Sequence, residues 1–234
     1  MITEGFNRYV PHIMVVDGFY KNPERVRAEA LKLEFIEDDR YYKGSRTQEK
    51  YITEGLINEF SRLMDHDIED WDNQPMNGIF QKTTKDDPLV YHSDQQDYAG
   101  AIYLTPGAPV DQGTSFWRHK VTGCRRPPQH FLEQRMDITA DDVYNENTLL
   151  NSDAWELIDR VGSMYNRLVI WDAKMIHSAT KYGEDERLVQ LFFFNLSRTK
   201  PVPKVILSNQ KYTEPATSPT LLLPGTSSKI TAIG

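Results

Sequence analysis

Two residues of types that commonly bind metals, a histidine and an aspartate, stand two positions apart in a stretch that is typical of a β-strand. The stretch reads Tyr91-His92-Ser93-Asp94. On a strand, the side chains at positions i and i+2 point to the same face, so His92 and Asp94 can converge on one ion. Such a short pattern also occurs by chance in polar turns, so the pair alone does not establish a metal site.

A third metal ligand is expected from the C-terminal half of the chain. His177 follows the strand-like run Leu168–Trp171 after a short connection. Two imidazoles and one carboxylate on one face of an octahedron leave three positions open, and this arrangement suits non-haem Fe(II) in oxygenases. We therefore take His92, Asp94 and His177 as the candidate metal ligands.

A single positively charged residue stands at the start of the most apolar stretch of the chain. Arg187 begins the predicted strand 187–196, and the acidic residues just before it belong to a turn that we expect to face water. A guanidinium in this position either reaches water at the edge of a sheet or serves as a buried receptor for an anion. Arginine binds a carboxylate through two parallel hydrogen bonds, so a dicarboxylic co-substrate would suit Arg187.

The order of these residues resembles that of the Fe(II)/2-oxoglutarate-dependent oxygenases of the double-stranded β-helix fold, most closely their prolyl-hydroxylase-like branch. The resemblance extends over roughly residues 78–196 and rests on His-x-Asp, Ile102-Tyr103-Leu104, Gly113-Thr114-Ser115-Phe116, His177 and Arg187. It implies that His92, Asp94 and His177 hold Fe(II), and that Arg187 pairs with the distal carboxylate of 2-oxoglutarate. It also implies that O₂ is consumed, that succinate and CO₂ are released, and that an unactivated C–H bond of the prime substrate is hydroxylated.

Two positions depart from the patterns of this superfamily. Many members carry Ser or Thr two residues after the arginine, where this chain has Val189. Tyr103, which matches a carboxylate-binding tyrosine of the prolyl-hydroxylase-like branch, or Thr114 is the expected replacement, and packing of Tyr103 inside the barrel is an alternative. The branch that demethylates nucleic acids has a second arginine six residues after the first, where this chain has Phe193.

The expected fold is α+β and mainly β, with a jelly-roll or cupin-like core covered by N-terminal helices. Asn22-Pro23 indicates a helix start, with Asn as N-cap and Pro at the first helical position. We expect a second helix over 53–64 and a third over 155–161, capped by Ser152 or Asp153. Strands are expected over 78–83, 89–94, 99–104, 114–117, 167–171 and 187–196.

The domain organisation predicted from the sequence is one oxygenase domain over 1–200 followed by an arm over 201–234. Within the domain, 1–77 is a helical buttress and 78–196 is the core, which contains a lid-like insert at 119–165. We expect the insert to help select the substrate. Its basic residues, between Arg118 and Arg126, are either a solvated loop or a grip for an anionic substrate. Asp172 is a candidate to hydrogen-bond a ligating histidine or, alternatively, faces water.

Composition limits the classes of protein that fit. The chain has 234 residues, a net charge of −7 and a mean hydropathy of −0.59, and its one cysteine cannot form an internal disulfide. These values, together with the absence of a signal-like N-terminus, favour a cytoplasmic protein that binds neither membranes nor nucleic acids. A small molecule or an amino-acid or peptide side chain is the expected substrate, and the oligomeric state is left open.

Two other classes of protein remain compatible with the sequence. One is a non-catalytic jelly-roll module that acts by binding. The other is a cupin-like metalloenzyme that uses O₂ without 2-oxoglutarate, in which Arg187 would have no co-substrate to bind.

Overall fold

The structure is a computed structural model, in which residues 11–37, 44–128 and 138–197 are described. They belong to a compact unit that runs from Met1 to Lys200. The predicted arm over 201–234 lies outside the described residues, so the predicted domain division stays a prediction.

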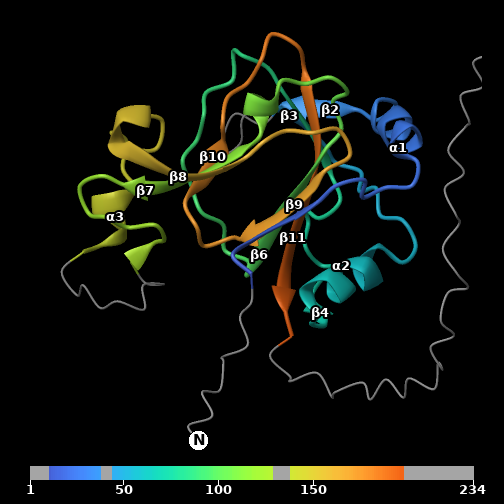
Figure 1. Cartoon of the computed structure of the whole chain (residues 1–234), viewed down its shortest axis with the longest axis horizontal. Coiled ribbons are helices and arrows are strands. Elements are labelled where there is room, and N and C mark those ends of the chain that lie inside the picture. The colour runs from blue at the N-terminus through green and yellow to red at the C-terminus, as the bar shows by residue number, and fades with distance from the viewer. Residues whose placement is uncertain (1–10, 38–43, 129–137, 198–234) are drawn as a thin grey trace, which may run out of the picture. The chain divides into compact units, whose positions relative to one another are not determined.

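Two antiparallel sheets form the core (Figure 1). The larger sheet has the strand order β1-β9-β6-β11-β5-β3-β2, with β4 paired to β11, and the smaller sheet has the order β10-β7-β8. The strands of the larger sheet are β1 (Ile13–Val16), β2 (Phe35–Glu37), β3 (Ser45–Thr47), β4 (Ile68–Glu69), β5 (Phe80–Thr83), β6 (Tyr98–Tyr103), β9 (Leu168–Asp172) and β11 (Arg187–Leu196). Those of the smaller sheet are β7 (Thr114–His119), β8 (Trp155–Val161) and β10 (His177–Ala179). The expected jelly-roll class of fold is confirmed.

Strand β11 lies between two hydrophobic cores, because its side chains point alternately to the two faces of the sheet. Leu188, Phe192 and Phe194 face the helices, whereas Val189, Leu191 and Phe193 belong to the cluster between the sheets. The stretch reads as continuously apolar because both faces of β11 are covered.

Helices α1 (Pro23–Ala30) and α2 (Leu56–Met64) lie on one side of the larger sheet (Figure 1). The predicted cap of α1 is confirmed, since the Asn22 side chain accepts a hydrogen bond from the backbone N–H of Arg25 at 3.1 Å. Helix α2 begins three residues later than predicted because Gly55 has a φ of 79°, outside the helical region. Phe60 of α2 is fully buried and packs on Phe192, with ring centroids 4.8 Å apart.

The helix predicted over Trp155–Val161 is wrong, because these residues form strand β8 along β7. A short 3-10 turn (Ser152–Ala154) precedes the strand and is capped by Asn151 rather than by either predicted residue. The register between β7 and β8 shifts at Phe116/Trp117. This irregularity breaks the alternation of apolar residues in β8, which removes the sequence signal of a strand.

The predicted strand over 89–94 is also absent from both sheets. In its place the structure has an isolated bridge between His92 and His177. A further α-helix, α3 (Ala140–Val143), lies in the connection between β7 and β8. The predicted insert at 119–165 is only partly a connection, since its residues Trp155–Val161 form β8 of the smaller sheet.

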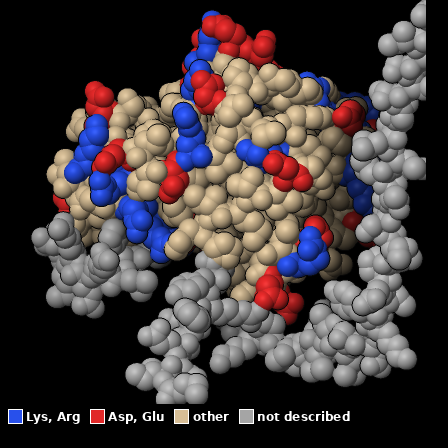
Figure 2. All heavy atoms as spheres, in the orientation of Figure 1, with Lys and Arg blue, Asp and Glu red and all other residues tan. Residues whose placement is uncertain are grey.

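Positive and negative side chains are intermixed over much of the face shown in Figure 2, and several positive ones adjoin one another toward its lower left. Several charged side chains of the described residues form ion pairs, among them Arg118 with Glu156 and Arg167 with Asp17. Among the described residues, no helix is long and apolar enough to cross a bilayer.

Candidate metal centre and co-substrate pocket

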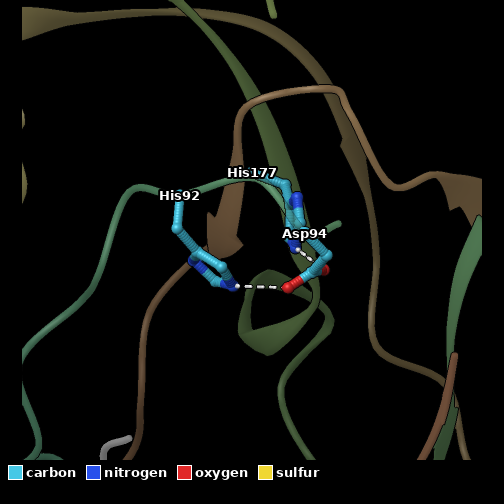
Figure 3. Close-up of side chains that lie close together, drawn as sticks. All are labelled: His92, Asp94 and His177. Atoms are coloured by element: carbon cyan, nitrogen blue, oxygen red, sulfur yellow. Dashed lines mark ion pairs between the residues drawn. The ribbon is translucent and has the colours of Figure 1, made fainter. Parts of the chain in front are cut away.

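The structure brings His92, Asp94 and His177 together (Figure 3). Their ligand atoms all lie within 4.8 Å of one another. Asp94 lies between the two rings, with Oδ1 3.8 Å from Nε2 of His92 and Oδ2 3.3 Å from Nε2 of His177. Among the described residues, this is the one group of three or more histidine, cysteine or carboxylate side chains that is close enough to hold an ion.

Both imidazoles are oriented by backbone carbonyls. Nδ1 of His92 lies 2.9 Å from the carbonyl oxygen of Val90, and Nδ1 of His177 lies 2.8 Å from that of Met175. A carbonyl oxygen only accepts hydrogen bonds, so Nδ1 carries the proton in each neutral ring. Nε2 then presents its lone pair toward Asp94, as a metal ligand requires.

The sequence-based suggestion that Asp172 orients a ligating histidine is wrong. Asp172 instead pairs with Arg126, and its Oδ2 lies 3.6 Å from Nδ1 of His12. Basic side chains of the region between Arg118 and Arg126 also have partners outside the cavity. Arg118 pairs with Glu156, and Nζ of Lys120 donates to the carbonyl of Asp153. The structure therefore gives no support to a basic grip at the site.

Asp94 supplies the electrostatic reason for a cation at this place. Its Oδ2 atom is buried and has no hydrogen-bond partner while the neighbouring imidazoles are neutral. Burial opposes ionisation of this carboxyl and is the largest single effect, but His177, His92 and Arg46 together outweigh it and hold the pKa of Asp94 below its ordinary value. A buried carboxylate oxygen without a donor is costly, and a cation bound by Asp94 and the two imidazoles would remove that cost.

The imidazole of His92 is also adapted to stay neutral. Loss of solvation in the cavity and the neighbouring His177 both lower the pKa of His92, and these effects outweigh the attraction of Asp94. Neutral imidazole is the form that binds metals, so the environment favours the ligand form of His92.

The three side chains open into a cavity of about 520 Å³ that lies between the two sheets. Both sheets contribute to its wall, through β6, β9 and β11 of the larger sheet and β7 and β10 of the smaller one. Small and apolar side chains form much of the wall near the metal ligands, and they include Ala101, Trp171, Val189, Leu191 and Phe193. A volume of this size is typical of sites for small ligands.

Arg187 lines the same cavity and is only 6% exposed. Its Nε donates to the carbonyl oxygen of Gln112 at 3.0 Å, and no carboxylate among the described residues pairs with it. The acidic residues of the preceding turn are exposed, as predicted, and Glu186 pairs with Lys82 at 3.0 Å. Arg187 is therefore a buried cation without an anion among the described residues, which is costly unless a ligand supplies one.

Tyr103 lies beside Arg187, and Thr114 contacts Tyr103. The Tyr103 ring centroid is 5.4 Å from the Arg187 guanidinium carbon, and the Tyr103 hydroxyl is 2.8 Å from Oγ1 of Thr114. Thr114 lines the cavity, whereas Tyr103 is 1% exposed. Burial raises the pKa of Tyr103 against the lowering effect of Arg187, so its hydroxyl keeps its proton and can donate.

Two glycines allow the Gln112 loop to approach Arg187. A Cβ at Gly113 would lie 1.9 Å from the carbonyl oxygen of Val161, and one at Gly183 would lie 2.0 Å from the side-chain nitrogen of Gln112. A larger residue at Gly113 would clash with backbone atoms and push the loop away, whereas one at Gly183 would displace the side chain of Gln112. These close approaches fix the carbonyl that holds Nε of Arg187.

Several polar residues that line the cavity were not predicted from the sequence, among them Arg46 and Tyr182. Arg46 enters it from β3, whose register pairs Arg46 with Gln81 of β5. Tyr182 lies between His177 and Arg187 in the sequence and also lines the cavity. Because Tyr182 lies between two candidate site residues in the sequence, its place in the cavity could have been expected. Nothing in the sequence indicated that β3 would reach the cavity.

Comparisons with known proteins agree with this architecture. The model of the family described as "Family of unknown function (DUF6445)" matches residues 79–186. No curated protein matches the sequence. The structure is similar to that of HygX from Streptomyces hygroscopicus with nickel, 2-oxoglutarate and hygromycin B bound, at a TM-score of 0.53 and 14% identity, covering 81% of this chain and 84% of HygX.

Two further solved structures show weaker similarity. A Pseudomonas putida prolyl-4-hydroxylase has a TM-score of 0.41 and 13% identity over 80% of this chain and 93% of its own. AviO1 from Streptomyces viridochromogenes Tue57 has a TM-score of 0.49 and 13% identity over 81% and 91%. At these identities, the likeness to HygX establishes the double-stranded β-helix fold alone.

Proposed function

We propose that the protein is an Fe(II)- and 2-oxoglutarate-dependent oxygenase that hydroxylates an unactivated C–H bond and releases succinate and CO₂. One observation carries the proposal: His92, Asp94 and His177 converge in the cavity that also contains the buried cation Arg187. A metal site alone would fit many proteins. A metal site with a buried anion receptor in the same cavity fits a dicarboxylic co-substrate that bridges the two.

The residues of the chain divide the work as follows. His92, Asp94 and His177 would hold the iron and leave positions open for ligands. When bound, the iron supplies the redox chemistry that activates O₂ with 2-oxoglutarate as reductant. Arg187 would bind the distal carboxylate, and the hydrogen-bonded pair of Tyr103 and Thr114 would supply one further hydroxyl donor. The apolar wall limits the access of water to the reacting centre.

The proposed substrate is a small molecule or an amino-acid or peptide side chain. The cavity volume suits a small ligand. The HygX structure contains hygromycin B together with 2-oxoglutarate, and this supports a small-molecule substrate for the same fold. The net charge of −7 favours a substrate other than nucleic acid.

The proposal is tested by anaerobic addition of Fe(II) and 2-oxoglutarate to the purified protein. We expect a weak visible charge-transfer band that needs both additions. Succinate should form when O₂ is admitted with the Fe(II)-loaded protein, and Asp94→Ala should abolish both signals. Iron binding without a 2-oxoglutarate-dependent band would favour the cupin-like metalloenzyme, and no iron binding would favour the non-catalytic module.

A further inference from the structure

A tyrosine from the connection between β7 and β8 contacts the segment that carries two of the three candidate ligands. The hydroxyl of Tyr144, the residue that follows α3, donates to Oγ of Ser93 at 3.1 Å. Ser93 separates His92 from Asp94 in the sequence. Burial raises the pKa of Tyr144 above that of a free tyrosine, so its hydroxyl remains a donor at neutral pH.

The same connection also holds the residue on the other side of His92. The backbone N–H of Tyr91 donates to the carbonyl of Leu149 at 2.9 Å. The Tyr91 ring stacks on Trp155, with centroids 5.5 Å apart and planes 11° apart. Tyr91 and Trp155 share a hydrophobic cluster with Val143 of α3. Contacts from the connection therefore flank His92 at Tyr91 and at Ser93.

The segment depends on these contacts because it belongs to neither sheet. His92 exchanges two backbone hydrogen bonds with His177, at 3.0 and 2.8 Å, and the N–H of Asp94 donates to Ala173 at 2.8 Å. No ladder of strand hydrogen bonds continues to either side of this isolated bridge. Metal affinity requires ligands held within about 0.5 Å of their working geometry, so additional anchors of the segment should matter.

We propose that Tyr144 is a positioning residue of the metal centre, whose hydrogen bond to Ser93 holds His92 and Asp94 in place opposite His177. The inference rests on the proposed function, because it takes these three residues as metal ligands. Tyr144 acts through Ser93. The connection between β7 and β8 is therefore a scaffold that supports the ion.

The test compares Tyr144→Phe with the wild type in affinity for Mn(II), measured by calorimetry, and in the melting temperature of the metal-free protein. The substitution removes one hydroxyl and keeps the ring. We expect the Kd for Mn(II) to rise about two- to tenfold, equivalent to about 0.4–1.4 kcal/mol, which is comparable with the net contribution of one hydrogen bond.

Tyr20→Phe is the matched control. The Tyr20 hydroxyl donates to Oε1 of Gln190 at 2.7 Å, and burial raises the pKa of Tyr20 as it does that of Tyr144. Tyr20 belongs to the cluster packed against the helices, away from the cavity. We expect this variant to melt at a lower temperature and to bind Mn(II) with the affinity of the wild type.

A double-mutant cycle with Ser93→Ala separates positioning from general destabilisation. The double variant should bind Mn(II) no more weakly than the weaker single variant, because both substitutions break the same hydrogen bond. Additive losses, or wild-type affinity in Tyr144→Phe, would overturn the inference while leaving the proposed function intact. If Tyr144→Phe does not fold, Ser93→Ala alone decides, since it removes the acceptor. A wild type that binds no divalent metal would overturn both proposals.

Discussion

His92 and His177 exchange a pair of backbone hydrogen bonds, and their imidazole rings lie 4.4 Å apart between centroids. The pair joins two segments that are far apart in sequence. It places the first residue of β10 directly opposite a residue of the irregular segment before β6. Because both side chains leave the bridge toward Asp94, the backbone itself sets the spacing of the candidate metal ligands (Figure 3).

The first prediction concerns His177→Ala. Loss of a partner beyond the ligands typically lowers metal affinity 10- to 100-fold, so loss of a ligand should weaken Fe(II) binding by at least about a hundredfold. Iron retained after anaerobic dialysis measures the effect. His66→Ala is the control, since the His66 ring contacts the carbonyl of Met64 and does not line the cavity. Equal iron content in the wild type and His177→Ala would show that the triad is misassigned.

The second prediction concerns Arg187→Lys. Lysine keeps the charge but loses the planar pair of donors that matches a carboxylate. We expect the Kd for 2-oxoglutarate, titrated anaerobically with Fe(II) present, to rise about ten- to a hundredfold. Iron binding should not change, because Arg187 lies outside the ligand set.

Arg118→Lys provides the matched control for that experiment, because Arg118 forms an exposed pair with Glu156 outside the cavity. It should bind 2-oxoglutarate as the wild type does. Equal affinity in Arg187→Lys and the wild type would remove the main support for a dicarboxylic co-substrate.

Local patterns predicted those parts of the molecule that local geometry determines. The His-x-Asp spacing selected His92 and Asp94 as candidates, although the strand assumed for them is absent, and the apolar run after Arg187 indicated the bounds that β11 has. The cap at Asn22 was also readable, since a side-chain oxygen and a following proline act within one turn. These signals need no knowledge of distant segments.

Features that depend on strand register were not predictable. Because of the bulge in the β7–β8 pair, the apolar residues of β8 follow a spacing that resembles that of a helix, so the sequence did not indicate a strand there. Arg46 reaches the cavity because β3 pairs with β5, at a register that no residue of β3 specifies. The contact of Tyr144 with Ser93 joins positions 51 residues apart, and likewise depends on the packing of the whole connection.

The third prediction concerns the pH dependence of the metal-free protein. The folded state lowers the pKa of His92 below its ordinary value of 6.5, so the unfolded chain takes up this proton first as the pH falls. The free energy of unfolding should therefore decrease on acidification, starting near pH 6.5. The lowered pKa of Asp94 acts in a separate window below its ordinary value of 3.8, where stability is lost as the carboxylate is protonated.

Urea denaturation at a series of pH values between 5 and 7.5 measures the His92 effect. His92→Gln should show a flatter dependence over this range, because it removes the group whose pKa is shifted. An identical slope in the variant and the wild type would mean that another group titrates.

The last prediction concerns Phe192→Ala and distinguishes the stability of the fold from metal binding at the site. Phe192 is fully buried on the face of β11 that meets the helices, where it packs on Phe60 and stacks on Trp71 with ring centroids 5.8 Å apart. Phe192→Ala leaves a cavity in this core and should lower the free energy of unfolding by about 3–5 kcal/mol. Because the neighbouring residues of β11 face the opposite side, the folded fraction should keep the wild-type Kd for Mn(II). Weakened metal binding by folded Phe192→Ala would show that the two cores are coupled through β11.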